Sequence, residues 1–332
     1  MAGVIRDPFG RSLDYVRISV TDRCNFRCRY CMPAEGVAWI PHERIMTYED
    51  ILFLCEVLTG LGVRRVRFTG GEPFVRKGFV PFLAEVRNRF PHLAMAVTTN
   101  GSFLEAWADR LPALGLDSVN VSLDTLDPSK FTAMTAMGGI DQVLRGIDAV
   151  LAAGSVPVKL NTVVVRSVNA AEIEDLVLFA GRKGVLLRFI EFMPLDGQVW
   201  SREEYVPAEE IRGRLPAPDA WLPDEAPTQG PNGPARYYVH ERTGQRVGII
   251  SAVSDHFCGR CNRLRVTATG EIRSCLFRDD SVPIMEALRM RDASALQALI
   301  LAAAAAKPRE GGTGLPKETD SPGYRHMSRI GG

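Results

Sequence analysis

Six of the seven cysteines fall into two groups of three, and this grouping is the strongest chemical feature of the sequence. The first group has the spacing C-x3-C-x2-C, and the second has the spacing C-x2-C-x13-C. The first comprises Cys24, Cys28 and Cys31, and the second comprises Cys258, Cys261 and Cys275. Three thiolates can hold three irons of a cubane cluster and leave the fourth iron open, whereas the common ferredoxin runs supply four cysteines. The spacings therefore predict two 4Fe–4S clusters, each with one iron available to a small molecule.

Zinc and simple core packing are the alternative explanations of these cysteines. Structural zinc prefers four ligands, so each group would need a further donor. His42 lies eleven residues beyond Cys31, and His256, two residues before Cys258, is better explained as a solvated loop residue. The first group would otherwise be unconnected core thiols, and the second a zinc ribbon that lacks one cysteine. Cys55 shares a predicted helix face with leucines and is expected in the core.

Two arginines follow the second cysteine pair almost directly. Arg263 and Arg265 are separated by one residue, so both point to the same face of a strand. Their rigid guanidinium groups suit phosphate oxygens. Without the neighbouring cysteines, a solvated basic edge would be the simpler explanation. Beside them, the pair predicts a site for an anionic substrate.

Length and composition indicate an ordinary globular protein of about two domains. Of the 332 residues, 46% are apolar and 24% charged, and the net charge of +1 gives no overall field for nucleic acid or an acidic membrane surface. Residues 1–11 lack the apolar region of a signal peptide, and the longest apolar run, residues 293–306, is too short to span a bilayer. We expect a cytoplasmic protein, where disulfides are rare and cysteines serve metal or redox chemistry.

The first 195 residues alternate between strand-like and helix-like segments. Strands are expected at residues 15–20, 64–69, 93–98, 118–122, 156–165 and 185–189, and helices at 47–60, 79–89, 104–114, 140–153 and 170–183. Six such units in a row predict parallel strands and a partial TIM-like (β/α)6 barrel. Polar segments end four of the strands, at residues 69–73, 98–101, 121–124 and 189–193, which is where barrel enzymes place their sites.

The remaining residues, 196–332, predict a C-terminal domain that carries the second cysteine group. Residues 216–234 contain six prolines and are expected to form an irregular connector. Hairpins are expected at residues 235–251 and 264–274, and a helix over residues 283–306. Residues 307–332 are rich in glycine and proline and are expected to be a flexible tail.

The first cysteine motif, Cys24-Asn-Phe-Arg-Cys28-Arg-Tyr30-Cys31, resembles that of the radical S-adenosylmethionine (SAM) superfamily. Together with the second cysteine group, the Arg-Leu-Arg segment and the final Gly331-Gly332, the chain is similar nearly end to end to the GTP 3′,8-cyclase family of molybdenum cofactor biosynthesis. The resemblance implies two 4Fe–4S clusters, of which the first binds SAM and the second, auxiliary one binds the guanine base of GTP. It also implies that a radical from SAM takes hydrogen from C3′ of the ribose, that the C3′ radical then bonds to C8 of guanine, and that a reduction of the resulting radical gives 3′,8-cyclo-GTP.

The resemblance also implies roles for individual residues. SAM contacts are expected at Tyr30, Gly71, Ser122 and Met193, and GTP contacts at Arg17, Arg67, Thr98, Lys159, Arg263 and Arg265. Arg17, Arg263 and Arg265 would neutralise the triphosphate, and Gly331 and Gly332 would reach into the site. Since the sequence contains no G-x4-G-K-[ST] segment, GTP is expected as a substrate in the barrel rather than in a P-loop.

The implied partners are an external electron donor and a second copy in a homodimer, with no nucleic acid and no membrane. The alternative enzyme is a radical SAM peptide-modifying enzyme with an auxiliary cluster, which would need more cysteines in the C-terminal part. A zinc- or cluster-binding interaction protein without catalysis is the alternative from another class.

Overall fold

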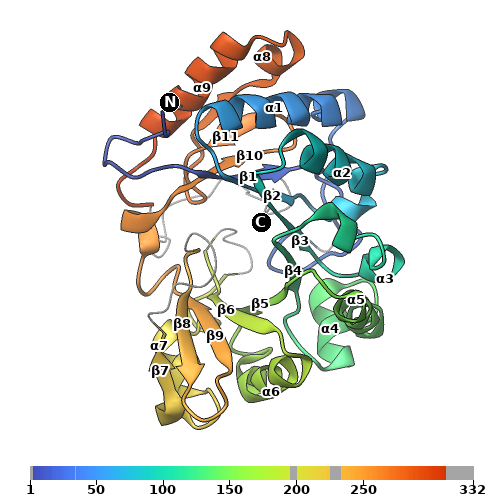
Figure 1. Ribbon diagram of the computed structural model, residues 1–332. Coiled ribbons are helices and arrows are strands. Elements are labelled where there is room, and N and C mark those ends of the chain that lie inside the picture. The colour runs from blue at the N-terminus through green and yellow to red at the C-terminus, as the bar shows by residue number, and fades with distance from the viewer. Residues whose placement is uncertain (1–2, 34, 195–199, 225–232, 312–332) are drawn as a thin grey trace.

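The computed structural model describes residues 3–33, 35–194, 200–224 and 233–311. One twelve-stranded sheet runs through these ranges, in the order β12-β11-β10-β1-β2-β3-β4-β5-β6-β9-β8-β7. Figure 1 shows the sheet curving around a central space, with helices on its outer side. None of the helices in the described ranges combines the length and hydrophobicity that a bilayer crossing needs.

Six parallel strands in chain order confirm the predicted partial barrel. They are β1 (Tyr15–Ser19), β2 (Arg65–Thr69), β3 (Ala94–Thr99), β4 (Ser118–Ser122), β5 (Val158–Val164) and β6 (Leu186–Glu191). The helices between them are α1 (Tyr48–Gly60), α2 (Phe79–Arg89), α3 (Leu104–Trp107), α4 (Pro128–Thr135), α5 (Ile140–Ala153) and α6 (Ile173–Lys183). Alternate strand residues enter the core, as period-two patterning requires.

Helix α1 illustrates how local sequence determines these elements. Thr47 and Asp50 form a capping box: the Thr47 hydroxyl accepts from the Asp50 amide at 3.1 Å, and the Asp50 carboxylate accepts from the Thr47 amide at 2.9 Å. The helix face that includes Leu54 and Leu58 is buried against the sheet. Cys55 lies on the same face with no exposed surface, which confirms its place in the core.

The C-terminal strands extend the barrel at both of its edges. They are β7 (Trp221–Pro223), β8 (Arg236–His240), β9 (Arg246–Ile250), β10 (Arg263–Val266), β11 (Glu271–Arg273) and β12 (Ser281–Pro283). The two expected hairpins are present as the β8–β9 and β10–β11 pairs. Each hairpin also adds a strand parallel to the barrel, β9 beside β6 and β10 beside β1, so that eight parallel strands surround the centre.

Two of the predicted helices are broken. Residues 104–114 form α3 and a separate 3-10 turn, η3 (Pro112–Leu114), because proline lacks the amide that a continuous helix needs. Residues 283–306 begin at the end of β12 and then form α8 (Met285–Arg289) and α9 (Ala293–Ala305). The break follows from the left-handed Arg291 (φ 54°) and from Asp292, whose side chain caps α9 at the Ala295 amide.

Other segments differ from the sequence-based expectation. Helices α4 and α7 (Ala208–Gly213) were not predicted, and the proline-rich connector contains β7, where Trp221 is buried and its Nε1 donates to the Pro216 carbonyl at 2.8 Å. The expected tail begins with a buried residue, Lys307. The division into domains at residue 195 stays a prediction.

Candidate active site

One cavity of about 590 Å³ is enclosed by the curved sheet and its loops. Both cysteine groups line it. The remaining predicted site residues within the described ranges also line it: Arg17, Tyr30, Arg67, Gly71, Thr98, Ser122, Lys159, Met193, Arg263 and Arg265. The predicted Gly331 and Gly332 lie outside the described residues. Among these predicted residues, the fold thus brings together chemical groups that are up to 258 residues apart, from Arg17 to Cys275.

The two cysteine groups lie at opposite ends of the same strands. The first group is in the loop that follows β1, at the carboxyl end of the parallel strands. Cys258 and Cys261 precede β10, which runs parallel to β1, and Cys275 follows the antiparallel β11. A strand of five residues such as β1 spans roughly 15 Å. The cavity therefore has a cysteine group at each end and strand side chains between them.

The glycine pair after β2 lets the first cysteine loop pack on the sheet. A Cβ atom at Gly71 would lie 2.3 Å from the Arg23 carbonyl oxygen, and one at Gly70 would lie 2.6 Å from that of Thr21. Glu72 is fully buried, and its carboxylate accepts from the Asn100 amide at 2.6 Å and the Thr99 hydroxyl at 2.8 Å. Burial raises the pKa of Glu72 to about 7, although these bonds oppose the shift. The motif therefore positions the cysteine loop as well as lining the cavity.

The cysteines of the first group are half-buried, and the sulfur of one of them, Cys24, receives hydrogen bonds. Cys24 Sγ accepts from the Phe26 amide at 3.4 Å and from Asn100 Nδ2 at 3.8 Å. Burial raises the pKa of Cys24 to about 11, and burial together with the neighbouring Cys31 raises that of Cys28 well above its ordinary value. Bound metal reverses such a shift because cysteine ligates as thiolate.

Helix α4 and Asp124 support the same loop. The Arg27 and Arg29 amides donate to carbonyls at the end of α4, at 2.7 and 2.9 Å. The Tyr30 hydroxyl donates to Asp124 at 2.5 Å, and Asp124 accepts from the Val163 amide at 2.8 Å. Burial raises the pKa of Asp124 to about 6, although its hydrogen bonds to Tyr30 and Val163 limit the rise. Tyr30 is thereby tied to the strand ends of β4 and β5.

The second cysteine group has a more cationic environment. Burial raises the pKa of Cys261, but Arg263 and Lys307 outweigh it and lower the pKa to about 6. Arg263 also lies over the Phe257 ring, 4.8 Å from its centroid. His256 is exposed, and its Nδ1 contacts the Ala252 carbonyl at 2.9 Å. A partly ionised thiol beside two cations is suited to bind a metal.

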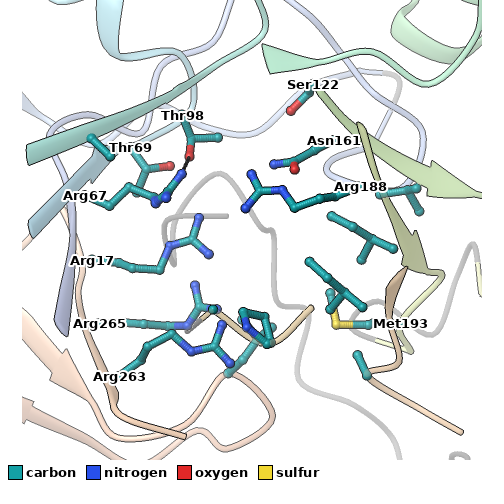
Figure 2. A pocket seen from close by; sticks show the side chains of 18 of the residues that line it. Arg17, Arg67, Thr69, Thr98, Ser122, Asn161, Arg188, Met193, Arg263 and Arg265 are labelled. Carbon is teal, nitrogen blue, oxygen red and sulfur yellow. Dashed lines mark hydrogen bonds between the residues drawn. The ribbon is translucent and has the colours of Figure 1, made fainter. Parts of the chain in front are cut away.

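A row of arginines crosses the wall between the two cysteine groups. The parallel register places Arg265, Arg17 and Arg67 side by side on β10, β1 and β2. In Figure 2 their guanidinium groups point into the cavity together with that of Arg263, and Arg188 faces them from the other side. Lys159 on β5 lines the same space. Since phosphate oxygens match guanidinium forks, this wall can bind a polyphosphate.

Sequence reasoning missed several polar residues of the cavity, among them Arg188, Asn161 and Tyr15. Arg188 is buried with an Nη2 bond to Asn120, while its Nε has no hydrogen-bond partner among the described residues. The same holds for the buried Oδ1 of Asn161. Burial raises the pKa of Tyr15, but Arg67 and Arg17 outweigh it and lower the pKa to about 8. The sequence could have indicated these residues in one way: each is a polar side chain at an inward position of a predicted strand.

The donor set fits iron–sulfur clusters. Each group supplies three thiols to the cavity wall, as a cubane with one open iron requires. Within the described ranges, no three His, Cys, Asp or Glu side chains gather closely enough to surround a single metal ion. Thiolate sulfur is stabilised by nearby positive charges and hydrogen-bond donors. The second cysteine group has cationic neighbours, and the first has amide donors.

Comparison with known proteins identifies the family. Residues 18–180 match the model of the radical SAM superfamily, and residues 185–312 match the model named Molybdenum Cofactor Synthesis C. A GTP 3′,8-cyclase of Heliobacterium modesticaldum is 43% identical over 98% of this chain and 99% of its own. This chain belongs to the GTP 3′,8-cyclase family. A second member, from Thermodesulfovibrio yellowstonii, is 41% identical over 99% of this chain and 100% of its own.

The family relationship explains the fold. Radical SAM enzymes use a 4Fe–4S cluster with SAM, and the cyclase family adds the C-terminal part to their partial barrel. A solved structure described as native anSMEcpe with bound AdoMet has the same fold, with a TM-score of 0.57 at 16% identity, covering 85% of this chain and 82% of that one.

Proposed function

We propose that this chain converts GTP into 3′,8-cyclo-7,8-dihydro-GTP, the first step of molybdenum cofactor biosynthesis. The observation that carries the proposal is the single cavity that joins both cysteine groups through a wall of arginines. A nucleoside triphosphate has an anionic end for the arginines and a base that can reach a cluster. Full-length relatives named GTP 3′,8-cyclase support this substrate.

Two clusters are part of the proposal. Cys24, Cys28 and Cys31 would hold the cluster that binds SAM, and Cys258, Cys261 and Cys275 would hold the auxiliary one. When bound, the reduced first cluster and SAM supply a 5′-deoxyadenosyl radical that removes a hydrogen atom from C3′ of the ribose. Gly71, Ser122, Met193 and Tyr30 would contact SAM, since they line the end of the cavity near the first group.

The side chains of this protein would bind and orient the nucleotide. Arg17, Arg67, Arg263 and Arg265 would neutralise the triphosphate together with Lys159, and Thr98 would add a hydroxyl beside Arg67, whose Nη1 lies 3.3 Å from it. Charges held in a partly dry cavity interact more strongly than in water. Holding C3′ close to C8 of the base raises the chance of bond formation, because two reacting groups no longer have to meet by diffusion.

Further features of the proposal rest on the family and the cysteine chemistry. The final Gly331 and Gly332 would enter the cavity, where the lack of side chains lets the backbone approach closely. An external electron donor would reduce the first cluster. The chain would act in the cytoplasm, where thiols stay reduced, and would form a homodimer.

The test is anaerobic incubation of the reconstituted, reduced protein with GTP and SAM. We expect 5′-deoxyadenosine to appear as GTP is consumed, with about eight irons per chain for two four-iron clusters. SAM cleavage that proceeds equally well without GTP would contradict the cyclase and favour a peptide-modifying enzyme. A protein that binds only zinc would contradict both enzymes.

A further inference from the structure

An N-terminal loop outside the cavity makes a concentrated set of contacts near the second cysteine group. Asp7 and Arg11 form a buried ion pair, with 0% and 8% of their side chains exposed. The Asp7 carboxylate also accepts from the Phe9 and Arg11 amides at 3.0 and 2.9 Å. These contacts hold the Arg11 guanidinium in one orientation. Arg11 is not among the proposed substrate contacts.

The Arg11 guanidinium reaches three carbonyl groups from two distant segments. Nη1 donates to the Cys258 carbonyl at 2.6 Å and to the Arg309 carbonyl at 3.1 Å, and Nη2 donates to the Pro308 carbonyl at 2.5 Å. The Cys258 carbonyl also accepts from the Cys261 amide at 3.1 Å, which closes the turn between these two cysteines. Arg11 thus joins the turn of the second cysteine group to the segment after α9.

That segment, residues 307–311, passes directly over the cysteines. Lys307 is buried, and its Nζ donates to the Arg263 carbonyl at 2.9 Å and to the Ser274 carbonyl at 2.6 Å. Four residues later, the Gly311 amide donates to Cys258 Sγ at 3.4 Å. A Cβ atom at Gly311 would lie 3.0 Å from Cys275 Sγ, so glycine lets the backbone approach both sulfurs.

We propose that Arg11 is a positioning residue for the auxiliary cluster: it fixes residues 307–311 against the second cysteine group and so holds the Gly311 amide on the Cys258 sulfur. This inference rests on the proposed second cluster. An amide bond to a ligating thiolate stabilises its negative charge, and outer-shell partners of this kind control how firmly a metal centre is held and its reduction potential. Lysine could not replace Arg11, because a single ammonium group cannot reach the Asp7 carboxylate and all three carbonyls at once.

The test isolates the second cluster in the full chain. In a background where Cys24, Cys28 and Cys31 are replaced by Ala, the protein is reconstituted with ferrous iron and sulfide, and iron loss to a chelator is followed. Arg11→Met and Arg11→Lys are expected to lose iron roughly 10-fold faster, as removal of outer-shell partners does. Arg6→Met is the matched control: Arg6 is exposed in the same loop, and within the described part of the chain its side chain donates only to the Gly10 carbonyl, at 3.2 Å.

A second pair of variants keeps the test decisive if the Arg11 variants fail to fold. Gly311→Pro and Gly311→Ala introduce the same Cβ, but only proline removes the amide donor, so Gly311→Pro is expected to lose iron faster than Gly311→Ala. The proposal is overturned if Arg11→Met keeps its iron as long as Arg6→Met, or if the two Gly311 variants behave alike. If the background itself takes up no iron, the second cluster is wrong and the role of Arg11 falls with it.

Discussion

At the scale of single residues, buried and half-buried cations line the cavity and repel one another in the absence of a bound anion. The Arg265–Arg17–Arg67 row is set by strand register, and Arg188 is directed at it from β6. Burial, and to a smaller extent repulsion by the positive charge of Arg263, lowers the pKa of Arg265 to about 10. A bound triphosphate would relieve this repulsion, which makes nucleotide binding sensitive to the number of positive charges.

This charge balance predicts that GTP affinity falls as the pH rises from 7 to 9. Burial, Arg188 and Arg67 lower the pKa of Lys159 to about 8, and Tyr15 has a pKa of about 8. Below pH 8 Lys159 is charged and Tyr15 is neutral; above it, the ammonium charge is lost and a phenolate charge is gained. Loss of the protonated Lys159 alone should weaken binding up to about ten-fold at pH 9.

Equilibrium dialysis of GTP against the anaerobic protein would measure this dependence. The double variant Lys159→Met, Tyr15→Phe should bind GTP more weakly at pH 7, and its affinity should depend less on pH. The pH dependence that remains in this variant measures the contribution of the nucleotide's own titration. A dissociation constant that stays the same between pH 7 and 9 in the unchanged protein would show that these two groups do not govern binding.

At the scale of elements, one buried carboxylate connects the two halves of the site. Glu191 ends β6, and it accepts from the Ala208 amide at 2.7 Å, the Val253 amide at 2.7 Å and the Ser254 amide at 2.9 Å. It therefore holds the segment after β9, which leads to Cys258, against the strand that leads to Met193. Relative placement of the two ends of the cavity depends on this junction.

Glu191→Gln should lower the free energy of unfolding by about 2 kcal/mol, because the amide group of glutamine turns one acceptor oxygen into a donor that faces backbone amides. Urea denaturation of the full chain measures the effect. Glu85→Gln is a suitable control, since Glu85 has 44% of its side chain exposed, pairs with Arg89 at the surface of α2 and should cost well under 1 kcal/mol. Equal stabilities of the two variants would contradict the structural role of Glu191.

At the scale of the whole molecule, the C-terminal part completes the barrel rather than standing beside it. Strands β9 and β10 add to opposite edges of the six-stranded barrel, and the loop between them carries Cys258 and Cys261. Helices α8 and α9 lie beside α1 on the outside (Figure 1). This topology places the second cysteine group at the amino end of the parallel strands, facing the first group along the cavity.

Local patterns in the sequence were sufficient for much of this arrangement. The six βα units and both cysteine groups follow from spacing and periodicity. The pairing of β10 with β1 could not be predicted, because register between strands about 250 residues apart leaves no local signal. Arg188 was missed for a related reason: a charged residue within a strand is identified as functional only when the opposite wall of the cavity is known.

The central claim is that GTP and SAM react in this one cavity, with hydrogen passing from C3′ of the ribose to the adenosyl group. The most direct test uses GTP deuterated at C3′ in an anaerobic reaction of the reconstituted protein with SAM, followed by mass spectrometry of the 5′-deoxyadenosine. The account predicts that 5′-deoxyadenosine gains one deuterium and that its formation depends on GTP. Unlabelled 5′-deoxyadenosine would contradict it.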